Sequence, residues 1–258
     1  TDKNGETLPN PGVEYIQWSE SYPIDCEAFM KDNSGKYVKY LWDPNSYINI
    51  MVYNFTTEPN SNSVTLGISH IPFSTTGKHY LEGLGGTDYS HLTLANLQFP
   101  LCVSINSLYI NEESTSTKYN TADVTVTLAH ELGHYLGLHH VFAETNNGTC
   151  EDTDYCKDTK SYNKQEYDSN CDYIYENERA KYTFENLVKR TGCDGIEFIS
   201  YNIMDYAISY SNQFTQNQRE RIRHVLSYSP LIPGPKKGDI DTRALNEGPL
   251  DLPIRTIK

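Results

Sequence analysis

Three stretches in the first half of the chain are rich in β-branched and aromatic residues, at positions 47–55, 64–73 and 101–110. Runs of this kind predict buried β-strands, because such side chains pack well on a pleated surface. Pro72 stands near the end of the second run, and a proline cannot donate a hydrogen bond to a neighbouring strand. We therefore expect the second run to form an edge of the sheet.

Two later segments have the end signals of helices. Residues 120–136 begin on a polar Asn-Thr-Ala-Asp run and are followed by a glycine, the residue that most often ends a helix. Residues 214–226 carry Thr215 as an N-cap, and Gln218 three positions later completes a capping box. After Pro230 the chain is rich in proline and glycine, which predicts an extended tail. Strands followed by helices predict an α+β fold.

Composition and charge exclude several classes of protein. The chain has 258 residues, with 21 Lys and Arg against 34 Asp and Glu, so its formal net charge is −13. The acidic balance and the lack of a basic run exclude a protein that follows a nucleic-acid backbone. No run of 18 apolar residues is present, so we expect no transmembrane helix. A chain with 21 Tyr, 8 Phe and 2 Trp has the means to build a core, and we expect a single domain over residues 1–258.

Four of the six cysteines fall in a stretch rich in Tyr, Asn and Asp; the six are Cys26, Cys102, Cys150, Cys156, Cys171 and Cys193. Residues 149–184 hold too few aliphatic side chains to pack a core. We therefore expect a loop held by disulfides, which form in an oxidising compartment. Scattered reduced thiols are the other interpretation, and the lack of a C-x2-C pair argues against a zinc finger.

One segment, from His130 to His140, reads HELGHYLGLHH. His130 and His134 are four positions apart, so on a helix both imidazoles leave the same face, at the spacing of two zinc ligands. Gly137 lets the chain leave the helix sharply, so that His140 can supply a third nitrogen. Glu131 lies beside the first ligand and is the candidate general base for metal-bound water. A buried histidine pair without metal and a zinc site without activity are the other interpretations.

This H-E-x-x-H-x-x-G-x-x-H motif resembles the signature of the metzincin metalloproteases. That family also has a tight turn with a methionine beneath the zinc, and residues 201–206 (YNIMDY) are similar to it, with Met204 as the methionine. The wider pattern resembles the pappalysin branch. Residues 154–159 are similar to its D-x-V-x-D-T loop, and residues 214–222 to its F-T-x-x-Q-x-x-R-M segment. The resemblance covers residues 120–228.

The resemblance implies a two-lobed catalytic domain. Its upper half, about residues 13–138, would hold a twisted mixed β-sheet with the active-site helix above the cleft. Its lower half, residues 139–228, would hold the Met-turn and the last helix in loop-rich chain, and residues 229–258 would form the extended tail. The same resemblance implies that Tyr206, two positions after the methionine, stabilises the oxyanion.

Calcium and disulfides are also implied by the resemblance alone. In the D-x-V-x-D-T loop, the candidate calcium ligands are the side chains of Asp154 and Thr159 and the carbonyl of Cys156. The family's disulfide pattern pairs Cys150 with Cys193, which leaves Cys156 to pair with Cys171. Cys26 and Cys102 stay unassigned.

One departure concerns the pocket for the residue that follows the cleaved bond. Arginine-specific relatives carry an acidic residue five positions after the methionine, and here that position is Ser209. A neutral pocket floor is not expected to select Arg or Lys by charge pairing.

These observations predict a zinc-dependent endopeptidase in which Glu131 moves protons and an extended protein or peptide substrate adds to the edge strand at residues 67–72. A zinc amidase acting on cell-wall peptides and a catalytically inactive zincin-like binding module are the alternatives. We expect a monomer that is secreted or anchored at the cell surface, with Thr1 downstream of a removed leader.

Overall fold

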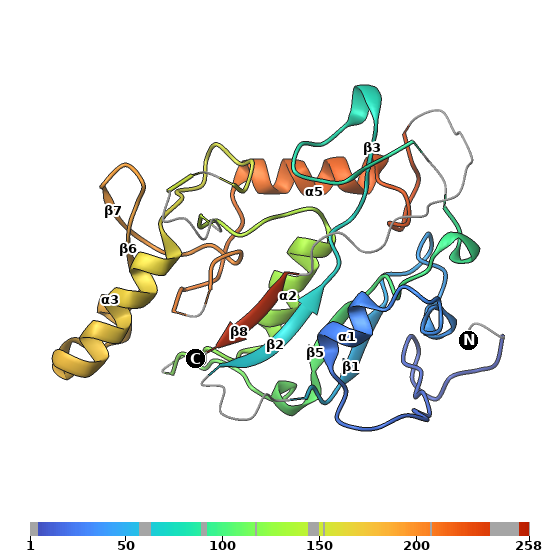
Figure 1. Ribbon diagram of the computed structural model, residues 1–258, viewed down its shortest axis with the longest axis horizontal. Helices are drawn as coiled ribbons and strands as arrows, with labels where there is room; N and C mark the ends of the chain where they lie inside the picture. Colours follow the sequence, from blue (N-terminus) through green and yellow to red (C-terminus); the bar gives the residue numbers. More distant parts are fainter. Residues whose placement is uncertain are drawn as a thin grey trace.

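A four-stranded mixed sheet forms the centre of the computed structural model, which describes residues 5–56, 63–88, 92–116, 118–143, 150–151, 153–206, 208–237 and 253–257. The strand order is β1 (Ile50–Tyr53), β5 (Val103–Asn106), β2 (Val64–Ser69) and β8 (Ile254–Ile257). β1 and β5 are parallel, whereas β5 with β2 and β2 with β8 are antiparallel (Figure 1). The α+β fold is confirmed, and the three strands predicted from the sequence lie within their expected stretches.

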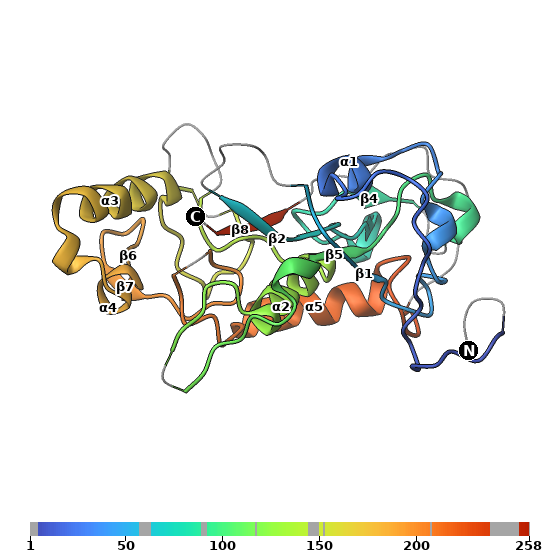
Figure 2. The same ribbon diagram turned by 90° about the horizontal axis from the view of Figure 1, so that it is seen from below.

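Helices cover both faces of this sheet. α1 (Cys26–Lys31) and α2 (Val124–Tyr135) lie on opposite sides of it (Figure 2). All four residues of β5 are buried, as expected for a strand covered on both faces. Phe29 and Met30 of α1 belong to the same hydrophobic core as Val103 of β5. This core fixes the sheet, and with it the surface on which α2 lies.

The two predicted helices are present. Asp123 caps α2, because its carboxylate accepts hydrogen bonds from the amides of Thr125 and Val126, and Gly137 follows the helix with a φ of 90°. α5 (Gln216–Tyr228) starts with the expected capping box between Thr215 and Gln218.

The prediction that β2 is an edge strand is wrong for the part of the chain described. β2 pairs with β5 on one side and with β8 on the other, so the edge position next to it belongs to residues 254–257. The free amide and carbonyl groups along an edge strand attract an extended segment, and a segment distant in sequence takes that place here. Pro72 lies beyond the end of β2, where it does not interfere with this pairing.

The expectation of a loop between residues 149 and 184 is also partly wrong, because α3 (Lys164–Asn177) occupies its second half. Asn163 caps this helix by accepting a hydrogen bond from the amide of Glu166, and Lys164 pairs with Asp168 at 2.5 Å. None of its residues is buried, so the helix has no apolar stripe that the sequence could have revealed.

Short elements complete the described chain. At the end of the molecule that α3 occupies lie α4 (Phe184–Leu187) and the antiparallel pair β6 (Lys189–Thr191) and β7 (Glu197–Ile199) (Figures 1 and 2). β3 (Ser74–Thr75) and β4 (Gly86–Thr87) pair in parallel. The remaining elements are 3-10 turns at Val38–Tyr40, Gly77–His79, Leu94–Asn96, Ser107–Tyr109 and Arg179–Lys181.

One of the two expected disulfides is present. Cys150 and Cys193 are bonded, with a Cα–Cα distance of 5.4 Å. The expected bond between Cys156 and Cys171 is absent, and neither of these residues takes part in a disulfide. Cys156 is buried in a turn beside Asp154, whereas Cys171 lies on α3. Because this segment is a helix and not the expected loop, the two thiols lie in different surroundings. Cys26 and Cys102 are buried cysteines outside any disulfide.

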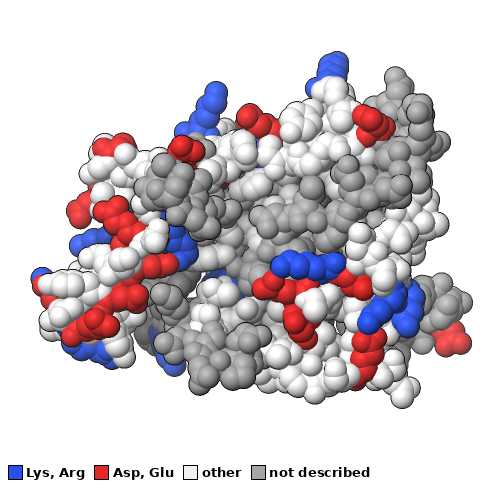
Figure 3. All heavy atoms as spheres, viewed as in Figure 1, with Lys and Arg blue, Asp and Glu red and all other residues white. Residues whose placement is uncertain are grey.

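Two features of the described residues agree with what the sequence predicts, one for membrane-spanning helices and one for acidic charge. Within the described residues, no helix is long and apolar enough to cross a membrane. Acidic side chains gather over α3 on the face shown in Figure 3, where the helix carries Glu166, Asp168, Asp172 and Glu176.

Candidate metal centre and active site

The three predicted metal ligands converge on one point. The Nε2 atom of His134 lies 3.0 Å from the Nε2 atoms of both His130 and His140, and the latter two are 3.2 Å apart. His130 and His134 come from consecutive turns of α2, and His140 returns to them after the bend at Gly137. All three are buried. They form the one cluster of possible metal ligands found among the described residues.

Main-chain carbonyls fix which nitrogen carries the proton in two of these rings. Nδ1 of His130 donates to the carbonyl of Ile203 at 2.7 Å, and Nδ1 of His134 donates to that of Leu138 at 2.8 Å. Since a carbonyl only accepts, the Nε2 atoms of these neutral rings present lone pairs to each other. Burial, followed by His134 and His140, lowers the pKa of His130 well below its ordinary value, so a shared proton does not hold the rings together.

A metal cation suits this arrangement better than any hydrogen bond. Two nitrogens that each lie about 2.0–2.1 Å from a tetrahedral zinc ion are about 3.3 Å apart, close to the 3.0–3.2 Å observed. Outer hydrogen bonds from Nδ1 to carbonyls are the usual support of zinc-bound histidines. Three nitrogen ligands leave a fourth position open, as in catalytic rather than structural zinc sites. The donor set therefore fits zinc.

Glu131 is completely buried between α2 and the sheet, and neither of its carboxylate oxygens has a hydrogen-bond partner among the described residues. Burial raises the pKa of Glu131 well above its ordinary value, and the positive charge of Arg255 and the nearby main chain of Arg255 oppose that shift. The side chain packs on Gly67 of β2, where an added Cβ would lie 2.6 Å from Cγ of Glu131. A buried carboxylate without partners is costly, which is typical of a group that acts on a ligand.

Met204 packs against α2, the helix that carries His130 and His134. It is fully buried, and a Cβ added to Gly133 of α2 would come within 2.4 Å of its Sδ atom. Asn202 holds the turn, because its Oδ1 accepts from the amide of Met204 at 2.9 Å and from Nε2 of Gln218 at 3.1 Å. The two motif segments that the sequence analysis singled out, at 201–206 and 214–222, are therefore joined by hydrogen bonds.

Tyr206 lies next to the metal cluster. Its ring centroid is 4.5 Å from that of His140 and 5.9 Å from that of His130. Phe142 packs against both Tyr206 and His140, with centroids 4.8 and 4.7 Å away. The phenol ring is thus held at the side of the three histidines, as its position in the motif suggests.

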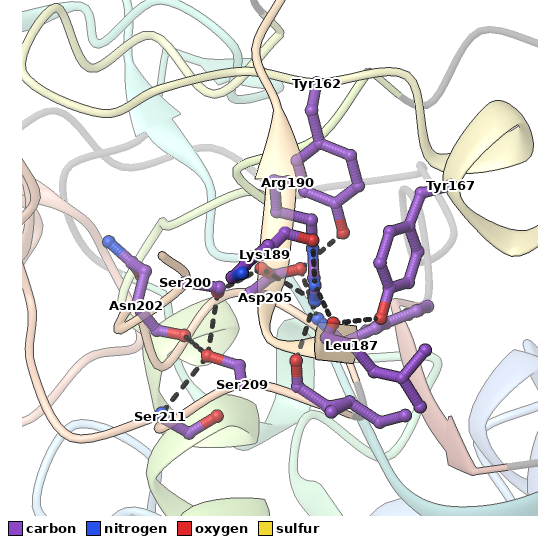
Figure 4. A network of polar contacts seen from close by, with 12 residues as sticks. Tyr162, Tyr167, Leu187, Lys189, Arg190, Ser200, Asn202, Asp205, Ser209 and Ser211 are labelled. Carbon is purple, nitrogen blue, oxygen red and sulfur yellow. Dashed lines mark hydrogen bonds and ion pairs between the residues drawn. The ribbon is translucent and has the colours of Figure 1, made fainter. Parts of the chain in front are cut away.

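A buried ion pair adjoins the turn at residues 201–206. Figure 4 shows Arg190 of β6 between the rings of Tyr162 and Tyr167, with Asp205 beside it. Nη2 of Arg190 is 3.4 Å from Oδ2 of Asp205, and Oδ1 of Asp205 accepts from the hydroxyl of Tyr162 at 2.6 Å and from the amide of Tyr206 at 2.7 Å. Asp205 therefore links Arg190 to the main chain of Tyr206.

Ser209 is fully buried, and protein groups surround its hydroxyl. Its Oγ lies 2.8 Å from Oγ of Ser200, and it accepts from the amide of Ser211 at 3.1 Å (Figure 4). The amide of Ser209 donates to the hydroxyl of Tyr119 at 3.4 Å. Its role as a pocket floor stays a prediction.

The three candidate calcium ligands share one turn. The hydroxyl of Thr159 donates to the carbonyl of Cys156 at 2.6 Å, and Oδ1 of Asp154 accepts from the amide of Cys156 at 2.9 Å. Asp154 is buried. Two of the three candidate ligand atoms therefore bond to each other, and a calcium ion at this turn stays a prediction.

Sequence reasoning missed four residues that shape the site: Gly67, Gly133, Arg190 and Arg255. Gly67 and Gly133 allow close approach to Glu131 and Met204. A glycine inside a strand pattern is a known signal of such an approach, so Gly67 could have been found. The roles of Arg190 and Arg255 follow from contacts with residues distant in sequence.

Comparison with known families and proteins gives consistent matches. A family model described as pregnancy-associated plasma protein-A, peptidase family M43, matches residues 85–227. The chain is 36% identical over 108 residues to proteins named extracellular metalloprotease from Arthroderma benhamiae and Trichophyton verrucosum, covering 42% of this chain and 32% of each relative. It thus spans about a third of the length of these relatives.

Among solved structures, mature mirolysin of Tannerella forsythia in complex with a cleaved peptide is similar, with a TM-score of 0.44 and 21% identity. That similarity covers 75% of this chain and 58% of mirolysin. The region matched by the family model contains the three histidines, Glu131 and Met204.

Proposed function

Since the match takes in more than half of its residues, the chain belongs to peptidase family M43, the pappalysins among the metzincins, and we propose that it is a zinc-dependent endopeptidase. The observation that carries the proposal is the convergence of three histidine Nε2 atoms beside a buried carboxylate with no hydrogen-bond partner among the described residues.

His130, His134 and His140 would hold the zinc ion. When bound, the ion would polarise the scissile carbonyl and make water a nucleophile at neutral pH. The carbonyls of Ile203 and Leu138 keep the rings of His130 and His134 in the required tautomer.

Glu131 would be the general base and then the general acid. Its raised pKa suits a carboxyl that must take a proton from water and hold it until the amine leaves. Gly67 and the fold of α2 on β2 keep the carboxylate in a dry environment, where such a transfer is not diverted to bulk solvent. Tyr206, beside His140, would stabilise negative charge on the carbonyl oxygen.

Two other functions are weighed against this one. A binding module with a structural zinc site would have no use for a buried carboxylate without partners, so the burial of Glu131 favours an enzyme. A zinc amidase acting on cell-wall peptides would use the same groups, and only substrate tests separate it. The relatives named extracellular metalloproteases support a secreted protein; anchoring at the surface and a monomeric state stay predictions.

The test is digestion of a peptide library from denatured proteins, read by mass spectrometry. The zinc-loaded chain should cut internal peptide bonds, a chelator should abolish the cuts, and added zinc should restore them. Cleavage that resists the chelator contradicts the proposal. A zinc-loaded chain that leaves the library intact but cuts cell-wall peptides favours the amidase.

A further inference from the structure

The strand β8 lies where a substrate of the proposed peptidase is expected to bind. Its residues pair antiparallel with β2, with Ile254 opposite Ile68, Arg255 opposite Gly67 and Ile257 opposite Val64. The amide of Ser69 extends the pairing, since it donates to the carbonyl of Pro253 at 3.2 Å. Main-chain hydrogen bonds of this kind are how an extended peptide binds to the edge of a sheet.

The register places Arg255 directly at the catalytic carboxylate. Gly67, the partner of Arg255 in the pairing, is the residue on which Glu131 packs. The main chain of β8 therefore runs along the edge of the sheet at the level of Glu131, where a bond to be cut by the proposed peptidase would lie.

The side chain of Arg255 fills the space beside α2. It is 1% exposed, and its Nη2 atom donates to the carbonyl of Thr121, just before the helix, at 3.1 Å. The carboxyl groups of Glu131 and Asp123 lie near the guanidinium of Arg255, as does Tyr119, whose hydroxyl accepts from the amide of Ser209. Tyr119 in turn contacts Ser209, the predicted floor of the substrate pocket.

Within the part of the chain that is described, the guanidinium of Arg255 does not use all of its hydrogen-bond donors, which favours a segment that can leave its position. The Nε and Nη1 atoms of Arg255 are buried, and neither has a hydrogen-bond partner among the described residues. Burial of unpaired guanidinium donors costs free energy, so part of the gain from strand pairing is lost.

We propose that residues 253–257 act as an internal pseudosubstrate, which blocks the active site by pairing with β2 and placing Arg255 beside Glu131. This inference rests on the proposed peptidase function. It differs from the prediction that β2 is free to receive substrate: the chain's own segment holds that position and must leave before a substrate binds.

Two variants of the full chain test the proposal, with one matched control. Arg255→Glu places a negative charge beside Glu131 and Asp123 and should release the segment, and Arg255→Ala should release it in part. Thr256→Ala, at the neighbouring position of β8, keeps both the strand pairing and the arginine. Circular dichroism and thermal unfolding establish that each variant is folded.

Binding is measured first, because it needs no catalysis. A labelled peptide with the sequence LDLPIRTIK, residues 250–258, should bind the zinc-loaded Arg255→Glu chain and bind the unaltered chain and Thr256→Ala at least tenfold more weakly. A tethered segment has an effective concentration of about 1 mM. If the free peptide binds with a Kd of about 0.1 mM, the ratio of the two values gives about tenfold weaker binding to the blocked chain. Equal binding to all three chains overturns the proposal.

Cleavage of a short peptide is measured next, and Arg255→Glu should raise kcat/KM about tenfold. If the labelled peptide binds as expected but no chain cuts any peptide, the peptidase function fails while the pseudosubstrate position stands. If all chains cut equally well, the peptidase function stands and the pseudosubstrate is wrong.

Discussion

Four buried histidines among the described residues differ in which groups their ring nitrogens face. His70 uses both nitrogens on main chain: Nδ1 accepts from the amide of Cys102 at 3.2 Å, and Nε2 donates to the carbonyl of Met30 at 3.1 Å. His130, His134 and His140 instead direct Nε2 at one another. Burial is common to all four, so the direction of the ring nitrogens, and not burial, separates a structural histidine from the candidate metal ligands.

His70 predicts a dependence of stability on pH. Burial lowers the pKa of His70 from 6.5 to about 4, so between these values the unfolded chain binds a proton that the folded chain does not. The contribution of the neutral ring is complete above about pH 6.5 and is lost as the pH falls towards 4. His70→Gln keeps one donor and one acceptor without titrating.

The measurement is denaturant unfolding of both chains at pH 7 and pH 4.5. The unaltered chain should lose about 2 kcal/mol more than the variant on acidification. Because both chains carry the same metal centre, its own acid sensitivity cancels in the comparison. An equal loss in the two chains contradicts the account of His70.

At the scale of elements, α2 is held against the Met-turn by close contact. Gly133 leaves room for Met204, and the pair Asn202 and Gln218 ties the turn to α5. The histidines on α2 thus depend on a turn and a helix that follow much later in the sequence.

Gly133→Ala tests this contact. Alanine favours a helix over glycine by about 1 kcal/mol, but its Cβ would lie 2.4 Å from Sδ of Met204. We expect the steric overlap with Met204 to outweigh the gain in helix propensity. The free energy of unfolding should fall by about 1–3 kcal/mol, and zinc binding should weaken. Combining it with Met204→Ala should make the cost of the alanine disappear. Thr125→Ala, on the exposed side of α2, is the control.

An element could be predicted from the sequence when its signals are local, and not when it depends on residues far apart in the chain. α2, α5 and the three strands carry local patterns and caps, and the histidine spacing is itself local, so all could be predicted. α3 has no buried residue, and its cap and its Lys164–Asp168 pair gave a weak signal. The strand β8 and the ion pair of Arg190 with Asp205 arise from distant pairing, which a single sequence does not reveal.

At the scale of the whole molecule, the disulfide joins Cys150 to Cys193, 43 positions apart, and the segment between them includes α3. A link over that length removes about 4 kcal/mol of chain entropy from the unfolded state. The histidines lie outside this segment, on α2 and just after it.

The double variant Cys150→Ser with Cys193→Ser should therefore have a free energy of unfolding about 2–4 kcal/mol lower and should keep its zinc at 25 °C. Calorimetry and metal analysis measure the two effects. Cys171→Ser, which alters a free cysteine, should leave stability nearly unchanged. A loss with Cys171→Ser as large as that of the double variant would show that Cys171 is bonded after all.

The most direct test of the proposed zinc mechanism compares the zinc-loaded chain with Glu131→Gln on one cleavable peptide, with the zinc content of both determined. The substituted glutamine would keep the size of the side chain and lose the ability to move a proton. If Glu131 is the general base, the two chains should hold equal amounts of zinc, and kcat/KM should fall about 100- to 10,000-fold in the variant. Equal zinc content with unchanged kcat/KM would contradict the assignment of Glu131 as the general base, and with it the proposed mechanism.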